Sequence, residues 1–138
     1  MNILQSINLT MKYTADKQEN YCVITLEEEN INSLLAPHLK SEFVIIKNEG
    51  AKNLILNLEK VKFVDSSGLS AILIANRLWA EQGSFIVTGV QNENVKKLFS
   101  ISRLDTVLTI IPTVSESIDY ISMEQIEAQL KTDTDIEE

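Results

Sequence analysis

Short apolar stretches alternate with longer amphipathic ones along this chain. Strand-forming residues cluster in four segments, at 21–26, 53–58, 85–88 and 107–111. Apolar residues recur at helical spacing in the segments between and after them, at 33–48, 68–82, 92–99 and 115–126. Runs of β-branched residues predict strands, whereas an apolar period near 3.6 predicts helices. The pattern therefore predicts strands and helices in regular alternation.

One strand-to-strand step precedes this alternation, because residues 13–20 are typical of an edge strand followed by a polar turn. The later loops leave no room for antiparallel hairpins, so right-handed crossovers and parallel pairing are expected. We predict an α/β fold with a small mixed four- to five-stranded sheet and helices packed mainly on one side. A length of 138 residues suits one domain with its own core.

The helical segments have defined apolar faces. Within 68–82, Trp79 is predicted to be a core residue, whereas Ile74 falls on the line of Ser70 and Arg77 that should face water. An exposed Ile74 either marks a partner contact or is an ordinary exposed apolar residue. The final helix is expected to carry Ile118, Ile121 and Ile126, with Thr113 or Ser115 as its cap.

Charge is distributed unevenly. The net charge is −8, and residues 124–138 contribute six acidic side chains and one lysine. We therefore divide the chain into an N-terminal extension (1–10), a folded domain (11–123) and an acidic tail (124–138). In this tail the last helix should end and the chain become disordered after about Lys131. The acidic balance argues against nucleic-acid binding, and no apolar run is long enough for a membrane helix.

The residues offer little material for catalysis. One histidine, His38, and one cysteine, Cys22, leave no nucleophile–base pair, and the four glycines form no phosphate-binding loop. The single cysteine excludes an internal disulfide, and the start of the chain lacks a signal peptide, so a cytoplasmic location is expected. Glu27–Glu29 form either a solvated strand end or a patch that faces a metal or a kinase. We expect no enzyme activity, no metal and no cofactor.

The most informative stretch is Lys62–Ala75, with the sequence KFVDSSGLSAILIA. Asp65, Ser66 and Ser67 are residue types that cap helices, and Gly68 permits close backbone approach. The segment therefore places two hydroxyl groups at a helix N-terminus, where the helix dipole tolerates a phosphate. From these residues alone, Ser66 could equally be a helix cap or a regulatory serine.

Phe63–Leu69 resembles the phosphorylation-site signature of STAS domains of the anti-sigma factor antagonist type, and the flanking chain agrees over much of its length. This resemblance implies a STAS fold and phosphorylation at Ser66, with Ser67 as second choice. Together with the exposed line of the helix, it yields one set of expected partner-binding residues: Asp65, Ser66, Ser67, Gly68, Ser70, Ile74, Asn30 and Asn32.

Asn30 and Asn32 mark a departure from the family. The family carries a Gly-Glu-Leu-Asp run before its first helix, and the corresponding stretch here is Glu29-Asn30-Ile31-Asn32. Both acidic positions are asparagines, which keep a similar shape and lose the charge. Glu27 and Glu28 lie close enough in sequence to restore charge nearby.

The resemblance implies a binding module that holds an anti-sigma factor with serine kinase activity and releases it once phosphorylated on Ser66. A serine phosphatase would reset it, and ATP would belong to the kinase. The alternative is a STAS subunit of a membrane transport system, docked on a transporter without inserting into the membrane. A more distant alternative is a small enzyme or nucleotide-binding protein.

Overall fold

The computed structural model describes residues 11–137, with side chains as far as residue 133, so the predicted extension 1–10 lies outside the described residues. Its elements, in chain order, are β1 (Tyr13–Lys17), β2 (Cys22–Leu26), β3 (Asn30–Ile31), α2 (Ala36–Asn48), β4 (Leu54–Asn57), β5 (Phe63–Val64), α3 (Ser66–Ala80), β6 (Phe85–Thr88), α4 (Glu93–Ile101), a 3₁₀ turn (Leu104–Thr106), β7 (Thr109–Ile111) and α5 (Val114–Glu137).

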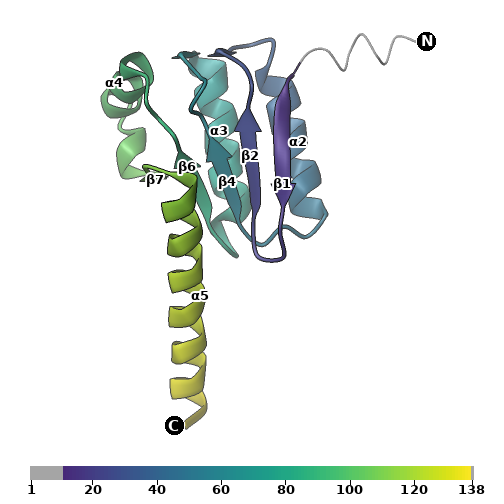
Figure 1. Ribbon diagram of the computed structural model, residues 1–138, viewed down its shortest axis with the longest axis vertical. Coiled ribbons are helices and arrows are strands. Elements are labelled where there is room, and N and C mark those ends of the chain that lie inside the picture. Colours follow the sequence, from purple (N-terminus) through teal and green to yellow (C-terminus); the bar gives the residue numbers. More distant parts are fainter. Residues whose placement is uncertain (1–10, 138) are drawn as a thin grey trace, which may run out of the picture.

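Five strands form one mixed sheet in the order β1-β2-β4-β6-β7 (Figure 1). β1 pairs antiparallel with β2, while β2, β4, β6 and β7 run parallel to one another. The predicted α/β fold with its mixed sheet is confirmed, and β1 is the expected edge strand. Because the parallel strands share a direction, the loops after β2, β4 and β6 gather at one end of the sheet.

Side chains alternate between the two faces of the sheet, and the two faces carry cores of different size. Ile24, Leu54 and Leu56 face α2, α3 and α4 in the larger core. Val23, Ile55 and Ile86 face the other way and pack on Ile121 of α5. Three helices therefore cover one face and one helix covers the other, as the prediction of helices mainly on one side requires.

Helix α3 is anchored at its far end by Trp79, which is almost completely buried. Its indole Nε1 donates a hydrogen bond to the Ala51 carbonyl oxygen at 3.1 Å, and its ring stacks on Phe85. The ammonium group of Lys47, a residue of α2, lies 5.5 Å from the centroid of the Trp79 ring. The prediction of Trp79 as a core residue is confirmed.

Two predictions about individual elements were wrong, one on the length of α5 and one on Ile74. Helix α5 continues to Glu137, where disorder was expected after about Lys131. Ile126 in the later part of α5 is exposed as a result, because this part of the helix runs beyond the sheet (Figure 1). Ile74 is half-buried, although it was expected to be exposed. A helix turns by ~100° per residue, which places Ile74 about 60° around α3 from the middle of its exposed face.

Candidate functional site

The start of α3 is positioned by a two-stranded ladder that no sequence pattern had indicated. β3 pairs parallel with β5, matching Asn30 with Phe63 and Ile31 with Val64. The backbone N–H of Asp65 then donates to the Ile31 carbonyl oxygen at 3.1 Å. This ladder brings the loop that follows β2 beside the first residues of α3. Asn30 and Asn32 are therefore neighbours of the Asp65–Ser67 segment, although more than thirty residues separate them along the chain.

Asp65 is the residue that caps α3. It has an extended backbone, and its carboxylate Oδ1 accepts a hydrogen bond from the Gly68 N–H at 3.0 Å. Its carbonyl oxygen also accepts the first helical bond, from Leu69 N–H at 2.9 Å. An aspartate at this position satisfies orphan N–H groups and also complements the helix dipole. The interpretation of Ser66 as the cap is therefore wrong.

Ser66 is the first residue of α3 and is exposed, whereas the following Ser67 is half-buried. The Ser66 hydroxyl forms no hydrogen bond with any other residue that the structure describes. Ser70 is exposed one turn further along, and it shares a face with Ser66 because residues four apart are neighbours on a helix. The start of α3 thus presents one accessible hydroxyl that the fold does not use.

Gly68 is buried beneath this surface and allows α3 to rest on the β3–β5 ladder. A Cβ atom there would lie 2.5 Å from the Ile31 carbonyl oxygen and 2.8 Å from Val64 Cγ1. Real Cβ atoms do not approach backbone oxygen so closely, so only glycine fits without displacement. Gly68 therefore supports the predicted binding surface from below, and its position excludes it from the exposed part of that surface.

The two asparagines behave differently. Asn30 is exposed on β3, whereas Asn32 is half-buried and its side-chain Oδ1 accepts from the N–H groups of Leu34 and Leu35 at 3.0 and 3.1 Å. Asn32 therefore caps the turn that leads into α2, a role that aspartate fills equally well. An aspartate would accept the same two hydrogen bonds, so asparagine at this position supports the same local structure without a negative charge.

Sequence reasoning did not identify two large apolar side chains at this end of the molecule. Phe63 is 57% exposed on β5, and Leu34 is 81% exposed in the turn before α2. The strand β5 contains only two residues, too few to reveal an exposed face by alternation. Exposed aromatic and aliphatic side chains beside polar groups are typical of protein-binding surfaces.

The three consecutive glutamates at the same end of the sheet are held by nitrogen donors. Glu27 pairs with Lys60 and Glu29 with Lys62, the latter at 3.3 Å, while Glu28 accepts from the backbone N–H of Lys12 at 2.7 Å. Hydrogen bonding to Glu27 raises the pKa of Lys60. Among the residues the structure describes, no group of three His, Cys, Asp or Glu could hold a metal ion. These contacts favour the interpretation of the glutamates as a solvated strand end.

The two residues considered for nucleophilic chemistry lie elsewhere. Cys22 is buried in β2, and burial raises the pKa of its thiol, which makes it a poor nucleophile at neutral pH. His38 is half-buried on α2. Within residues 11–137 no helix is both long enough and apolar enough to cross a membrane.

The family model for the STAS domain matches residues 12–117, and the chain belongs to this family. A relative from Thermotoga neapolitana, named as a candidate anti-sigma factor antagonist, is 29% identical over 101 residues, covering 72% of this chain and 88% of that protein. A relative of the same description from Bordetella bronchiseptica is 28% identical over 106 residues, covering 76% and 87%.

Solved structures share the fold. An anti-sigma factor antagonist from Mycobacterium paratuberculosis superposes with a TM-score of 0.73 at 16% identity, covering 81% of this chain and 94% of that one. SpoIIAA, another anti-sigma factor antagonist, matches in its unphosphorylated form with a TM-score of 0.62 at 20% identity, covering 80% and 98%. Its phosphorylated form gives 0.61 at 22%, covering 80% and 99%. The murine anion transporter Slc26a9 matches at 0.62 and 12% identity, where the shared part is 88% of this chain and 24% of the transporter.

Proposed function

We propose that this protein is an anti-sigma factor antagonist whose binding to its partner is switched by phosphorylation of Ser66. The observation that carries the proposal is that the cap of α3 and its exposed hydroxyl group come from two different residues. Asp65 caps the helix, and the exposed Ser66 hydroxyl has no described hydrogen-bond partner. A serine in this position is accessible to a kinase, and its modification breaks no structural bond.

Phosphorylation would change the surface more than the fold. A phosphoserine adds roughly −1.5 to −2 charges at neutral pH. The N-terminus of α3 stabilises that charge by about 0.3–1 kcal/mol, which offsets part of the repulsion from the adjacent Asp65. A docked partner would instead meet new bulk, new charge and a desolvation cost. A loss of about 3 kcal/mol at such an interface weakens binding more than 100-fold.

The names of the relatives suggest which partner this is. In our proposal the unphosphorylated chain holds an anti-sigma factor that is also a serine kinase, so that the sigma factor becomes free to direct transcription. The kinase uses its own ATP to phosphorylate Ser66 and is released, and a serine phosphatase restores the starting state. This chain needs no cofactor of its own, and the cycle operates in the cytoplasm.

The same geometry favours Ser66 over Ser67 as the modified residue. Ser67 is half-buried, so a kinase would have to displace neighbouring groups to reach it. In our proposal Asp65, Ser70, Asn30, Asn32 and Ile74 surround Ser66 as contacts of the partner, with Gly68 beneath them.

The test uses Ser66→Ala and Ser66→Asp chains as baits in a native extract, with retained proteins identified by mass spectrometry. Ser100→Asp is the matched control, because Ser100 is an exposed serine on α4. We expect an ATPase-type serine kinase on the Ser66→Ala and Ser100→Asp baits and its loss from Ser66→Asp. Incubating that kinase with ATP and the wild-type chain should place a single phosphate on Ser66.

Two outcomes would contradict the proposal. Identical partners on the Ser66→Ala and Ser66→Asp baits would exclude the switch, and transporter subunits among them would favour the transport alternative. A phosphate mapped to Ser67 in the reconstituted reaction would overturn the assignment of the residue and leave the switch itself in place.

A further inference from the structure

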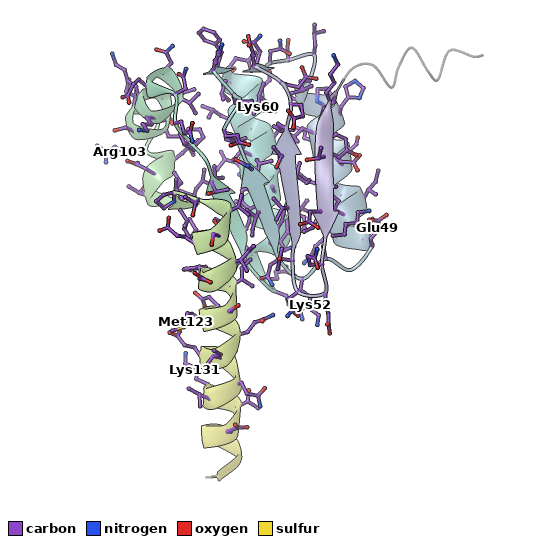
Figure 2. All side chains as sticks on the ribbon, in the orientation of Figure 1. Glu49, Lys52, Lys60, Arg103, Met123 and Lys131 are labelled. Carbon is purple, nitrogen blue, oxygen red and sulfur yellow. The ribbon has the colours of Figure 1, made fainter. Side chains whose placement is uncertain are left out.

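Helix α5 has two halves with different surroundings. In its first half, Ser117 and Ile121 are buried against the sheet, with Ile118 partly buried beside them. Residues 123–137, called the second half below, extend beyond the end of the sheet, where Figure 2 places Met123 and Lys131. On the side of this second half that faces the domain, residues from Glu124 to Ala128 line an open crevice. The loops before β4 and β6 line the rest of this crevice.

The opposite side of the second half carries an apolar stripe. Met123, Ile126 and Leu130 are 58%, 53% and 59% exposed and lie three and four residues apart, so they share one face. At ~100° per residue, Met123 is about 160° around the helix from the buried Ile121. The stripe therefore points away from the domain. Bending α5 into the crevice would not bury the stripe, because the crevice lies on the other side of the helix.

Carboxylates border this apolar stripe. By the same geometry Glu127 and Asp133 lie about 65° and about 55° to either side of its centre, and Asp119 lies on its line, one turn before Met123. Within the described residues, none of the three forms an ion pair, although Asp133 accepts a hydrogen bond from Gln129 at 3.2 Å. Lys131 is the sole basic residue in Val114–Glu137, and it lies about 100° from the stripe. The face is thus apolar along its centre, and it is negative along both sides and at its N-terminal end.

We propose that this face of α5 is a second binding surface, and that its partner is a basic amphipathic helix of another protein. The partner's apolar side chains would cover Met123 and Ile126, while its lysines or arginines would pair with Asp119, Glu127 and Asp133. A helix placed against an apolar stripe is a common mode of recognition, and complementary charge orients it.

The charges and the size of the face argue against other occupants. A second copy of α5 would bring the same carboxylates against one another, and a self-paired coiled coil needs about three or four heptads of apolar repeat. The stripe on α5 spans little more than one heptad. An anionic membrane would be repelled by the same carboxylates.

This second surface lies at the other end of the domain from Ser66. The crevice under α5 is bordered by loops that precede β4 and β6, whereas Ser66 and Asn30 follow β5 and β2 at the opposite end of the strands. Binding at α5 is therefore expected to be independent of phosphorylation, so that the domain holds one partner permanently while it exchanges another.

The test measures fluorescence anisotropy of a labelled synthetic helix of about three heptads, with leucine along one face and lysine beside it. The comparison peptide carries glutamate in place of every lysine. We expect the wild-type chain to bind the lysine peptide, and the affinity to fall as salt rises from about 0.05 to about 0.3 M, because screening shortens the range of the ion pairs.

Variants locate this binding on α5. Ile126→Ser and, separately, Glu127→Lys should each weaken binding about tenfold or more, the loss of one central contact at an interface. Ile101→Ser is the matched control, because Ile101 is 70% exposed on α4, and it should leave the affinity unchanged. Ser66→Asp should also leave it unchanged. Circular dichroism of each variant verifies that the domain remains folded.

Four outcomes would overturn the proposal. The first two are that the glutamate peptide binds as well as the lysine peptide, or that the lysine peptide does not bind. The third is that Ile101→Ser loses as much affinity as Ile126→Ser. The fourth is that the wild-type chain is a dimer in analytical ultracentrifugation and that Ile126→Ser dissociates it. The last outcome would assign the face to a second copy of this chain.

Discussion

Helices α3 and α5 pack on opposite faces of the same sheet, but only α3 is packed along its whole length. The buried residues of α3 run from Gly68 to Trp79, close to both of its ends. In α5 the buried residues are Ser117 and Ile121, both in its first half. The difference shows that one helix belongs entirely to the core, whereas the other is a core element followed by an exposed arm.

The N-termini of these helices also differ in how they use hydroxyl groups. At α5 the Thr113 hydroxyl is engaged, because its Oγ1 accepts from the Glu116 N–H at 3.1 Å and donates to the Glu116 carboxylate at 3.0 Å. At α3 the cap is a carboxylate, and the Ser66 hydroxyl is left over. A hydroxyl at a helix start is therefore a functional candidate only where another group already caps the helix.

The largest expected effect tests the packing of α3. Trp79→Ala removes a buried indole, its hydrogen bond to Ala51 and its stacking on Phe85, and should cost about 3–5 kcal/mol of unfolding free energy. Met123→Ala on the arm of α5 should cost less than about 0.5 kcal/mol. Urea denaturation of both variants measures the difference. Similar losses would mean that the arm is part of the core.

Gly68→Ala should have the next largest effect. The added Cβ meets the Ile31 carbonyl oxygen and Val64, so α3 has to shift away from the β3–β5 ladder, at a cost of about 1–3 kcal/mol. Ser70→Ala, at an exposed position of the same helix, is the control and should be nearly neutral. Denaturant midpoints measure both, and a neutral Gly68→Ala would refute the close packing inferred here.

Loss of a helix cap should lower the unfolding free energy by a smaller amount. The same measurement tells whether Ser66 is a helix cap or a serine that the fold does not need. Asp65→Ala and Thr113→Ala should each cost about 1 kcal/mol, because each leaves orphan N–H groups at its helix start. Ser66→Ala should change stability by less than about 0.5 kcal/mol. Thermal unfolding of the three variants tests this. A cost at Ser66 equal to that at Asp65 would restore the view that Ser66 is structural.

The smallest effect is expected from shortening the arm. A chain ending at Ala128 loses residues whose described side chains are exposed, so its unfolding free energy should change by less than about 0.5 kcal/mol. Thermal unfolding and the helical signal in circular dichroism measure stability and helix content together. A drop in stability of several kcal/mol would show that the arm supports the domain.

Much of this molecule follows from local residue patterns. The apolar periods predicted the α/β fold, the parallel strands and the edge strand, and turn residues gave Thr113 as one of two candidate caps of the last helix, which is the one that the structure uses. The stretch Phe63–Leu69 also predicted that a helix starts there, because its residue types are those that cap a helix and permit close packing, and its resemblance to the STAS signature marked that helix start as the candidate site. These features depend on neighbours along the chain, which a sequence displays directly.

The remaining features were decided by contacts between distant segments. The β3–β5 ladder is too short to have a period, yet it places Asn30 beside Asp65 and makes glycine necessary at position 68. The choice of Asp65 over Ser66 as the cap depends on the backbone at the turn. The exposure of Ile126 depends on where the sheet ends. A sequence shows which residues share a face, and only the tertiary structure decides whether anything lies opposite that face.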